Sequence, residues 1–98
     1  MNKTLKLERK NVLANTATKF EFDVEGYEFL VKNFNDFDIY VGFEETTDTS
    51  KMIKIPSETS QICVINKPTY SYTALISSKN IYVYAESVGE VEVQCIKY

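Results

Sequence analysis

The chain contains no histidine and no tryptophan, and it has only three glycines and two cysteines among its 98 residues. Without histidine, it lacks the base that most often activates a Ser, Cys or Thr nucleophile. The glycines stand far apart, so no glycine-rich loop can cradle a phosphate. Two separated cysteines without histidine match no zinc site of recognised spacing. We therefore expect a protein that is not an enzyme and has no catalytic residue, metal or cofactor.

Positive charge is too dispersed for nucleic-acid binding. Eleven basic residues stand against fourteen acidic ones, which gives a net charge of −3. The local basic cluster of Lys3, Lys6, Arg9 and Lys10 is interrupted by Glu8. Nucleic-acid binding usually needs a clustered basic face that displaces counterions from phosphates. We expect no nucleic-acid partner.

Long apolar runs are absent as well. The first thirty residues hold no apolar run of signal-peptide length, and no segment is long enough to span a bilayer. The sequence thus predicts synthesis in the cytoplasm, with no signal peptide and no membrane partner.

Cys63 and Cys95 both fall in apolar segments that resemble strands. A chain that stays in a reducing compartment is predicted to keep them as reduced, buried thiols. A disulfide requires that the two strands be neighbours.

Alternation of apolar and polar residues dominates the chain, and its period is that of a half-buried strand. In residues 19–24, apolar side chains share one face and charged side chains share the other. Glu25-Gly26 predicts a tight hairpin turn in which glycine supplies a positive φ. Residues 61–66 form a nearly continuous apolar run, which predicts a strand buried on both sides. Strands are expected at 19–24, 27–31, 37–43, 51–55, 61–66, 70–76, 80–86 and 90–97.

Evenly spaced strands without a helical stripe predict an all-β fold. The economical arrangement is a single antiparallel β-sandwich, jelly-roll or Ig-like, of about eight strands. A small β-barrel is the alternative. We assign the sandwich domain to residues 18–98. Residues 1–17 are expected to be an N-terminal arm or a short edge strand around Leu5 to Leu7, either frayed or added to a neighbouring subunit's sheet.

Acidic residues gather between positions 36 and 48. Asp36 and Asp38 flank a phenylalanine, and Glu44, Glu45 and Asp48 crowd one loop. A glycosidase needs two carboxylates across a cleft, and a calcium site needs several converging oxygens. The spacing matches no known calcium loop, so we interpret this segment as a solvated acidic turn.

Tyrosine is abundant, with seven in the chain. Tyr40, Tyr82 and Tyr84 are out of phase with the apolar residues beside them, and Tyr98 shares a strand face with Gln94. Exposed tyrosines at strand spacing suit a protein interface or a platform for sugars. These four residues are the candidate interaction surface, and ordinary cross-strand pairing is the alternative interpretation.

Several short motifs stand out along the chain: a strand ending in Asn33, the run Ile39-Tyr40-Val41-Gly42, the turn Ile55-Pro56, and the closing segments 81–86 and 89–93. They resemble motifs of the small β-sandwich proteins encoded in the structural regions of tailed phages and prophages. In that family, the last two segments form a hairpin. The resemblance covers about residues 29–93, and it implies a virion component such as a capsid decoration, fibre or head–tail accessory protein.

Together these observations predict a non-enzymatic structural or accessory subunit of phage or prophage origin. Its expected partners are itself or other virion proteins, in a homo-oligomer. A small carbohydrate- or ligand-binding module is the alternative, although the chain lacks tryptophan, the residue best suited to stacking on sugars.

Overall fold

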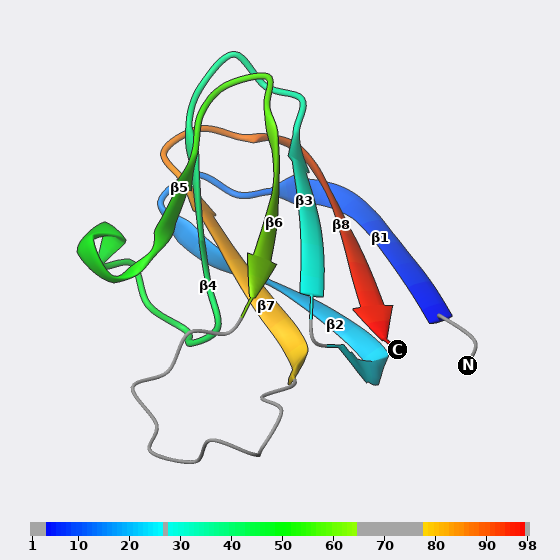
Figure 1. The fold of residues 1–98 in the computed structure, drawn as a ribbon. Helices are drawn as coiled ribbons and strands as arrows, with labels where there is room; N and C mark the ends of the chain where they lie inside the picture. Colours follow the sequence, from blue (N-terminus) through cyan, green and yellow to red (C-terminus); the bar gives the residue numbers. More distant parts are fainter. Residues whose placement is uncertain (1–3, 27, 65–77, 98) are drawn as a thin grey trace.

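The computed structural model describes residues 4–26, 28–64 and 78–97 of the chain (Figure 1). These residues form eight strands: β1 (Thr4–Val12), β2 (Thr16–Gly26), β3 (Glu28–Asn33), β4 (Ile39–Gly42), β5 (Ile53–Ile55), β6 (Ser60–Val64), β7 (Ser78–Ala85) and β8 (Gly89–Lys97). A 3-10 turn, η1 (Thr49–Lys51), lies between β4 and β5. The strand expected at 70–76 lies outside the described residues.

The strands make two four-stranded sheets. Sheet A has the order β1-β8-β3-β6, and sheet B has the order β2-β7-β4-β5. Figure 1 shows β6, β3, β8 and β1 side by side in one layer, with β2 and β7 behind them. The antiparallel pairs join first strand to last, second to seventh, third to sixth and fourth to fifth, which is the winding of a jelly roll. The predicted β-sandwich is confirmed in its jelly-roll form, and the barrel alternative is wrong because the described strands form two separate sheets.

The core between the sheets follows from the alternating pattern. Buried apolar residues recur at alternate positions within β2, β3, β4, β7 and β8, as at Phe20 and Phe22 of β2 and at Phe29 and Val31 of β3. Phe29 of sheet A stands 6.1 Å from Phe22 of β2 and 5.6 Å from Phe43, measured between ring centroids. These tilted ring contacts join the two sheets through the middle of the core.

The N-terminal segment, expected as an arm or a short edge strand, forms a nine-residue strand at the edge of sheet A. It pairs with β8 over its whole length, and Val12 at its end is fully buried. The ammonium group of Lys10 lies 4.7 Å from the ring centroid of Phe20, and Lys6 Nζ lies 3.9 Å from Asp23 Oδ2. These contacts to β2 close one side of the sandwich with charged side chains.

Two expected hairpins are crossings between the sheets. β2 belongs to sheet B and β3 to sheet A, so Glu25-Gly26 is not a hairpin turn, and no described glycine has a positive φ. Gly26 is needed because a Cβ atom there would collide with the Sγ atom of Cys95. β7 and β8 likewise lie in different sheets, so the closing motifs at 81–93 do not form the hairpin that the resemblance implies.

The loops at one end of the sandwich are held together by Asn33, which is 2 % exposed. Its side-chain amide donates hydrogen bonds to the backbone oxygens of Phe37, Ile55 and Pro56, at 2.8, 3.3 and 3.2 Å. Its Oδ1 atom accepts hydrogen bonds from the backbone and side-chain nitrogens of Asn35, both at 3.0 Å. Two motifs of the phage resemblance are therefore physically connected: the asparagine that ends β3 and the Ile55-Pro56 turn.

The strand expected at 61–66 to be buried on both sides is the edge strand β6, which ends at Val64. Its inward residue Cys63 is buried, but Ile62 and Val64 on its other face are 54 % and 51 % exposed. The prediction of double burial is wrong for the described chain because β6 has only the core on one side. In the part of the chain that the structure describes, no segment covers the apolar second face of β6.

Candidate interaction surfaces

Three of the four predicted interaction residues lie together on the outer face of sheet B. Tyr40 and Tyr84 are register partners between β4 and β7, with ring centroids 6.4 Å apart. Tyr82 lies two residues along β7, opposite Gly42. All three tyrosines are half-buried. Tyr98 lies outside the described residues.

The tyrosine row is engaged in contacts within the chain. The Tyr84 hydroxyl donates to Oδ1 of Asn15 at 3.4 Å, and aromatic cross-strand pairs of this kind stabilise a sheet. Among the described residues, none of the strongly exposed large apolar side chains lies on this face. The tyrosine row therefore offers little free apolar surface for a partner.

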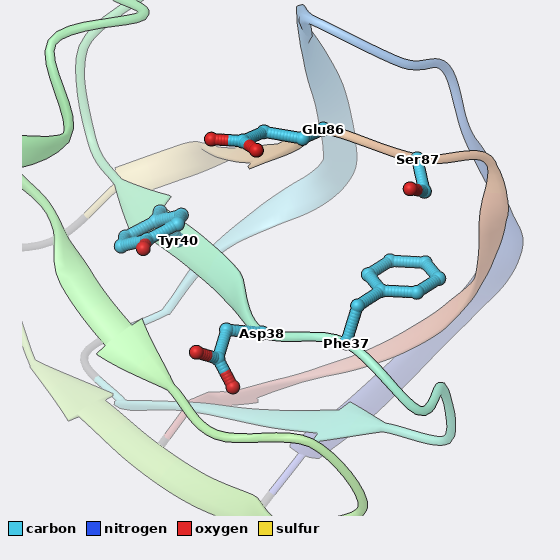
Figure 2. A pocket seen from close by; sticks show the side chains of 5 residues that line it. All are labelled: Phe37, Asp38, Tyr40, Glu86 and Ser87. Carbon is cyan, nitrogen blue, oxygen red and sulfur yellow. The ribbon is translucent and has the colours of Figure 1, made fainter.

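A shallow hollow of about 180 Å³ lies beside Tyr40 (Figure 2). Figure 2 shows the carboxylates of Glu86 and Asp38 at opposite rims, with the rings of Tyr40 and Phe37 on the other sides. Its volume is below the roughly 300–1,000 Å³ of most small-molecule sites. Asp38 is already engaged, because it accepts a hydrogen bond from the backbone nitrogen of Ser57 at 3.1 Å and pairs with a lysine of β5.

The acidic loop that follows β4 ends with a residue, Asp48, that caps the 3-10 turn η1. Asp48 Oδ1 accepts hydrogen bonds from the backbone nitrogen and hydroxyl of Ser50, at 3.1 and 2.6 Å. These bonds cap η1 and lower the pKa of Asp48. Among residues 4–26, 28–64 and 78–97, no group of three or more Cys, Asp or Glu side chains could hold a metal ion. In the same part of the chain, no helix has the length and apolar character to span a bilayer.

Within the described ranges of the chain, the outer face of sheet A carries the largest group of exposed apolar side chains, and sequence patterning missed it. Register places its outward side chains in three rows that cross the sheet in the order β1, β8, β3, β6. The first row is Leu5, Ile96, Glu28, Val64; the second is Leu7, Gln94, Leu30, Ile62; the third is Arg9, Glu92, Lys32, Ser60. We call the first two rows the apolar patch.

The apolar patch is open at both sides of the sheet. Leu5 and Leu7 on β1 are 50 % and 51 % exposed, matching the exposure of the two apolar residues of β6 at the opposite edge. Leu30 between them is half-buried, so the apolar surface runs across the sheet around Gln94. Adjacent apolar side chains on four strands are a feature that isolated exposed residues do not create.

The polar contacts of the third row converge on the carboxylate of Glu92. Oε1 of Glu92 accepts hydrogen bonds from Nε and an Nη atom of Arg9, at 3.2 and 2.7 Å. Its Oε2 atom lies 2.9 Å from the amide nitrogen of Gln94 and 3.4 Å from Nζ of Lys32. The Glu92 side chain is only 4 % exposed because these neighbours cover it.

This network holds Glu92 ionised. The hydrogen bonds from Gln94 and Arg9 are the largest causes, and they lower the pKa of Glu92 from 4.5 to about 2. The third row is therefore a charged border beside the apolar patch, with two cationic side chains gathered around one buried anion.

The two cysteines remain free and buried on the core side of sheet A. Both are register partners of Phe29, one from β6 and one from β8. β3 therefore separates them, and at about 4.8 Å per strand their Cα atoms stand about 9–10 Å apart, too far for a disulfide. Burial raises the pKa of Cys63 to about 11 and also raises the pKa of Cys95.

Comparison of the chain with protein-family models, curated proteins and solved structures finds no match.

Proposed function

We propose that this chain is a non-enzymatic structural or accessory subunit that works through protein–protein contacts made by the outer face of sheet A. The observation that carries the proposal is the composition of β6. Its outward residues Ile62 and Val64 give it the pattern of a doubly covered strand, but both are more than half exposed. A strand with two apolar faces is expected to be covered on both, so we infer that another protein covers the outer face of β6.

The neighbouring strands support this proposal. Leu5 and Leu7 extend the apolar surface to the far edge of sheet A, and the third row adds a charged border that contains an arginine. Protein interfaces commonly combine an apolar centre with a polar rim, and arginine is enriched in them. Contiguous exposed apolar surface on a small protein commonly marks an interaction site.

A place in a phage or prophage particle is the specific form of the proposal. It is supported by the motifs that resemble phage β-sandwich proteins, two of which, the strand that ends in Asn33 and the Ile55-Pro56 turn, are joined by hydrogen bonds. The jelly-roll winding adds support by analogy, since viral capsid domains use this fold. Lectins and cupins use it too, so the fold alone does not assign the function.

A carbohydrate- or ligand-binding module is the second candidate, and the hollow between Tyr40 and Phe37 is the observation that favours it. Its small volume makes it the weaker proposal. A glycan array with the purified chain and a Tyr40→Ala variant tests this directly. Binding that the variant loses would move the function to sheet B.

The main proposal is tested by measuring the size of the assemblies that contain the chain in the cells that produce it. Lysate from the cells that carry the gene, including cells with an induced prophage, is fractionated by size under mild conditions, and the chain is detected by antibody. We expect wild-type chain in assemblies much larger than its own 11.3 kDa. An Ile62→Glu variant should shift to the free chain, whereas Val88→Glu, at a 61 % exposed position off the sheet, should not.

Wild-type chain that migrates alone under all these conditions would contradict the proposal. So would an Ile62→Glu variant that remains in the large assemblies, because the outer face of sheet A would then make no contact that matters.

A further inference from the structure

The outer face of sheet A is approximately complementary to itself under a two-fold rotation. The two outer strands, β1 and β6, each present two half-exposed aliphatic side chains in the same two rows. The two inner strands, β8 and β3, present opposite charges in the third row, with Glu92 on β8 and Lys32 on β3. A surface that matches itself under a two-fold rotation can bind a copy of itself.

We propose that the partner of this face is a second copy of the chain, related by a two-fold axis that runs parallel to the strands between β8 and β3. This inference rests on the proposed function and names its partner. The rotation lays β1 of one copy over β6 of the other, and β8 over β3. Leu7 then meets Ile62 of the second copy, and Leu5 meets Val64 of the second copy.

The third row distinguishes this axis from its alternative. With the axis parallel to the strands, the third row of each copy lies over the third row of the other, so Glu92 and Lys32, which already pair within each chain, stay beside opposite charges. An axis along the rows would instead lay the first row over the third, which places Leu5 over Arg9 and Ile96 over Glu92. That arrangement sets apolar side chains against charge, and burying charge without a partner is costly.

Sheets that pack face to face are rotated by about 30° through their twist, so these matches hold between neighbouring side chains and not between single atoms. The first row matches itself less well than the other two, because Glu28 of one copy lies over Ile96 of the other at its centre. The aliphatic pairs at the two edges and the charges of the third row carry the match.

The size of the face sets the strength of the pairing. Four strands at about 4.8 Å spacing and three rows of outward residues cover about 400 Å² per copy, half of the roughly 800 Å² per partner in a standard stable interface. The pair is therefore weak in the isolated protein, with dissociation in the micromolar range or above. In a larger assembly, other contacts would hold the copies together and raise their effective concentration.

Sedimentation of the purified full chain over a range of concentrations tests the pairing. The average mass of the wild type should rise from 11.3 kDa toward twice that value as concentration increases. Leu7→Asp and Ile62→Lys, tested separately, should each weaken association by more than about tenfold, since each buries an unpaired charge at two symmetric places. Leu13→Asp is the matched control, because Leu13 is 58 % exposed but lies outside the strands, and it should leave association unchanged.

Mixing the two charged variants tests the geometry. Because β1 of one copy faces β6 of the other, an equal mixture of Leu7→Asp and Ile62→Lys should restore a dimer through one new ion pair and one original apolar pair. Leu5→Asp with Val64→Lys is the second matched pair, used if a thermal melt shows that either first variant has lost its fold.

Association that survives each single variant, or a mixture that stays monomeric while the wild type dimerises, would overturn the proposed two-fold pair. Edge-to-edge joining of sheets would give the first outcome, because it does not bury Leu7 or Ile62 between two faces. A wild type that is monomeric at every concentration would also overturn it. The proposed function would fail separately, if the chain migrates alone in the lysate of its natural source or if the Ile62→Glu variant remains in the large assemblies there.

Discussion

Replacing Glu92 with glutamine should destabilise the protein in a pH-dependent way. Glu92 is the anion on which Arg9, Lys32 and Gln94 converge, and glutamine keeps its size while removing its charge. The neutral side chain leaves two cationic neighbours without their counter-charge on the surface of sheet A. The loss should be largest where the carboxylate is ionised in the folded protein.

The pKa of Glu92 sets the magnitude. Its pKa is lowered from 4.5 to about 2 in the folded chain, and each pH unit of difference corresponds to about 1.4 kcal/mol. The ceiling is therefore about 3 kcal/mol. Because the Arg9 side chain is 51 % exposed, solvent screens part of the interaction, and we expect a loss of about 2 kcal/mol at pH 7.

The direction with pH follows from linkage. As pH falls, unfolded chains take up the proton on Glu92 first, near pH 4.5, while the folded chain resists protonation until about pH 2. The stabilisation is thus complete above about pH 4.5 and is lost between that pH and about pH 2. The wild type and the Glu92→Gln variant should become equally stable at the acid end.

Urea denaturation of both proteins at several pH values measures this difference. Glu90→Gln is the control, since Glu90 is an exposed carboxylate on the same strand. A Glu92→Gln variant as stable as the wild type at pH 7 would refute the reasoning. A deficit that stays constant down to pH 2 would do the same, because it would come from packing and not from charge.

Three further predictions concern other parts of the fold. Asn33→Ala should lower the free energy of unfolding by about 2–4 kcal/mol in the same assay, because three backbone oxygens each lose one hydrogen bond; a loss below about 0.5 kcal/mol would contradict this role. Glu58 has a φ of 57°, so Glu58→Gly should raise stability by about 0.5–1 kcal/mol, and a loss would show that its side chain matters more than its backbone. Cys63 and Cys95 should resist thiol reagents at neutral pH until the protein unfolds, and mild oxidation should not join them; rapid labelling or an intrachain disulfide would contradict their placement.

Local periodicity predicts which side chains form the core of this protein. The alternation through Phe20 and Phe22 in β2, and through Ile81 and Val83 in β7, places the same residues inside the sandwich in the structure. A strand exposes and buries alternate residues whatever its neighbours are, so this part of the fold follows from single segments.

Strand order does not follow from single segments, and the errors arise there. The apolar run around Ile62 correctly indicates two apolar faces, but only the pairing order shows that β6 is an edge strand with one of those faces open. The apolar patch unites Leu5 with residues more than fifty positions away. Glu92 meets Arg9 across 83 positions, so neither its burial nor its lowered pKa has a local signal.

The tyrosines illustrate the limit from the other direction. Pattern correctly indicates that Tyr40 and Tyr84 point away from the core, but it cannot show that they contact each other. The search for exposed aromatics thus led to sheet B, whereas Leu5, Leu7, Ile62 and Val64, which are half exposed, lie together on sheet A.

The most direct test of the account is to observe contacts between copies across the outer face of sheet A. Two samples of the chain, one with isotope-labelled methyl groups and one unlabelled, are mixed and examined by isotope-filtered nuclear Overhauser spectroscopy at high concentration. The account predicts intermolecular contacts between Leu7 and Ile62 and between Leu5 and Val64, which weaken together on dilution. Intermolecular contacts that involve other faces, or none from these four residues while the sample is associated, would contradict it.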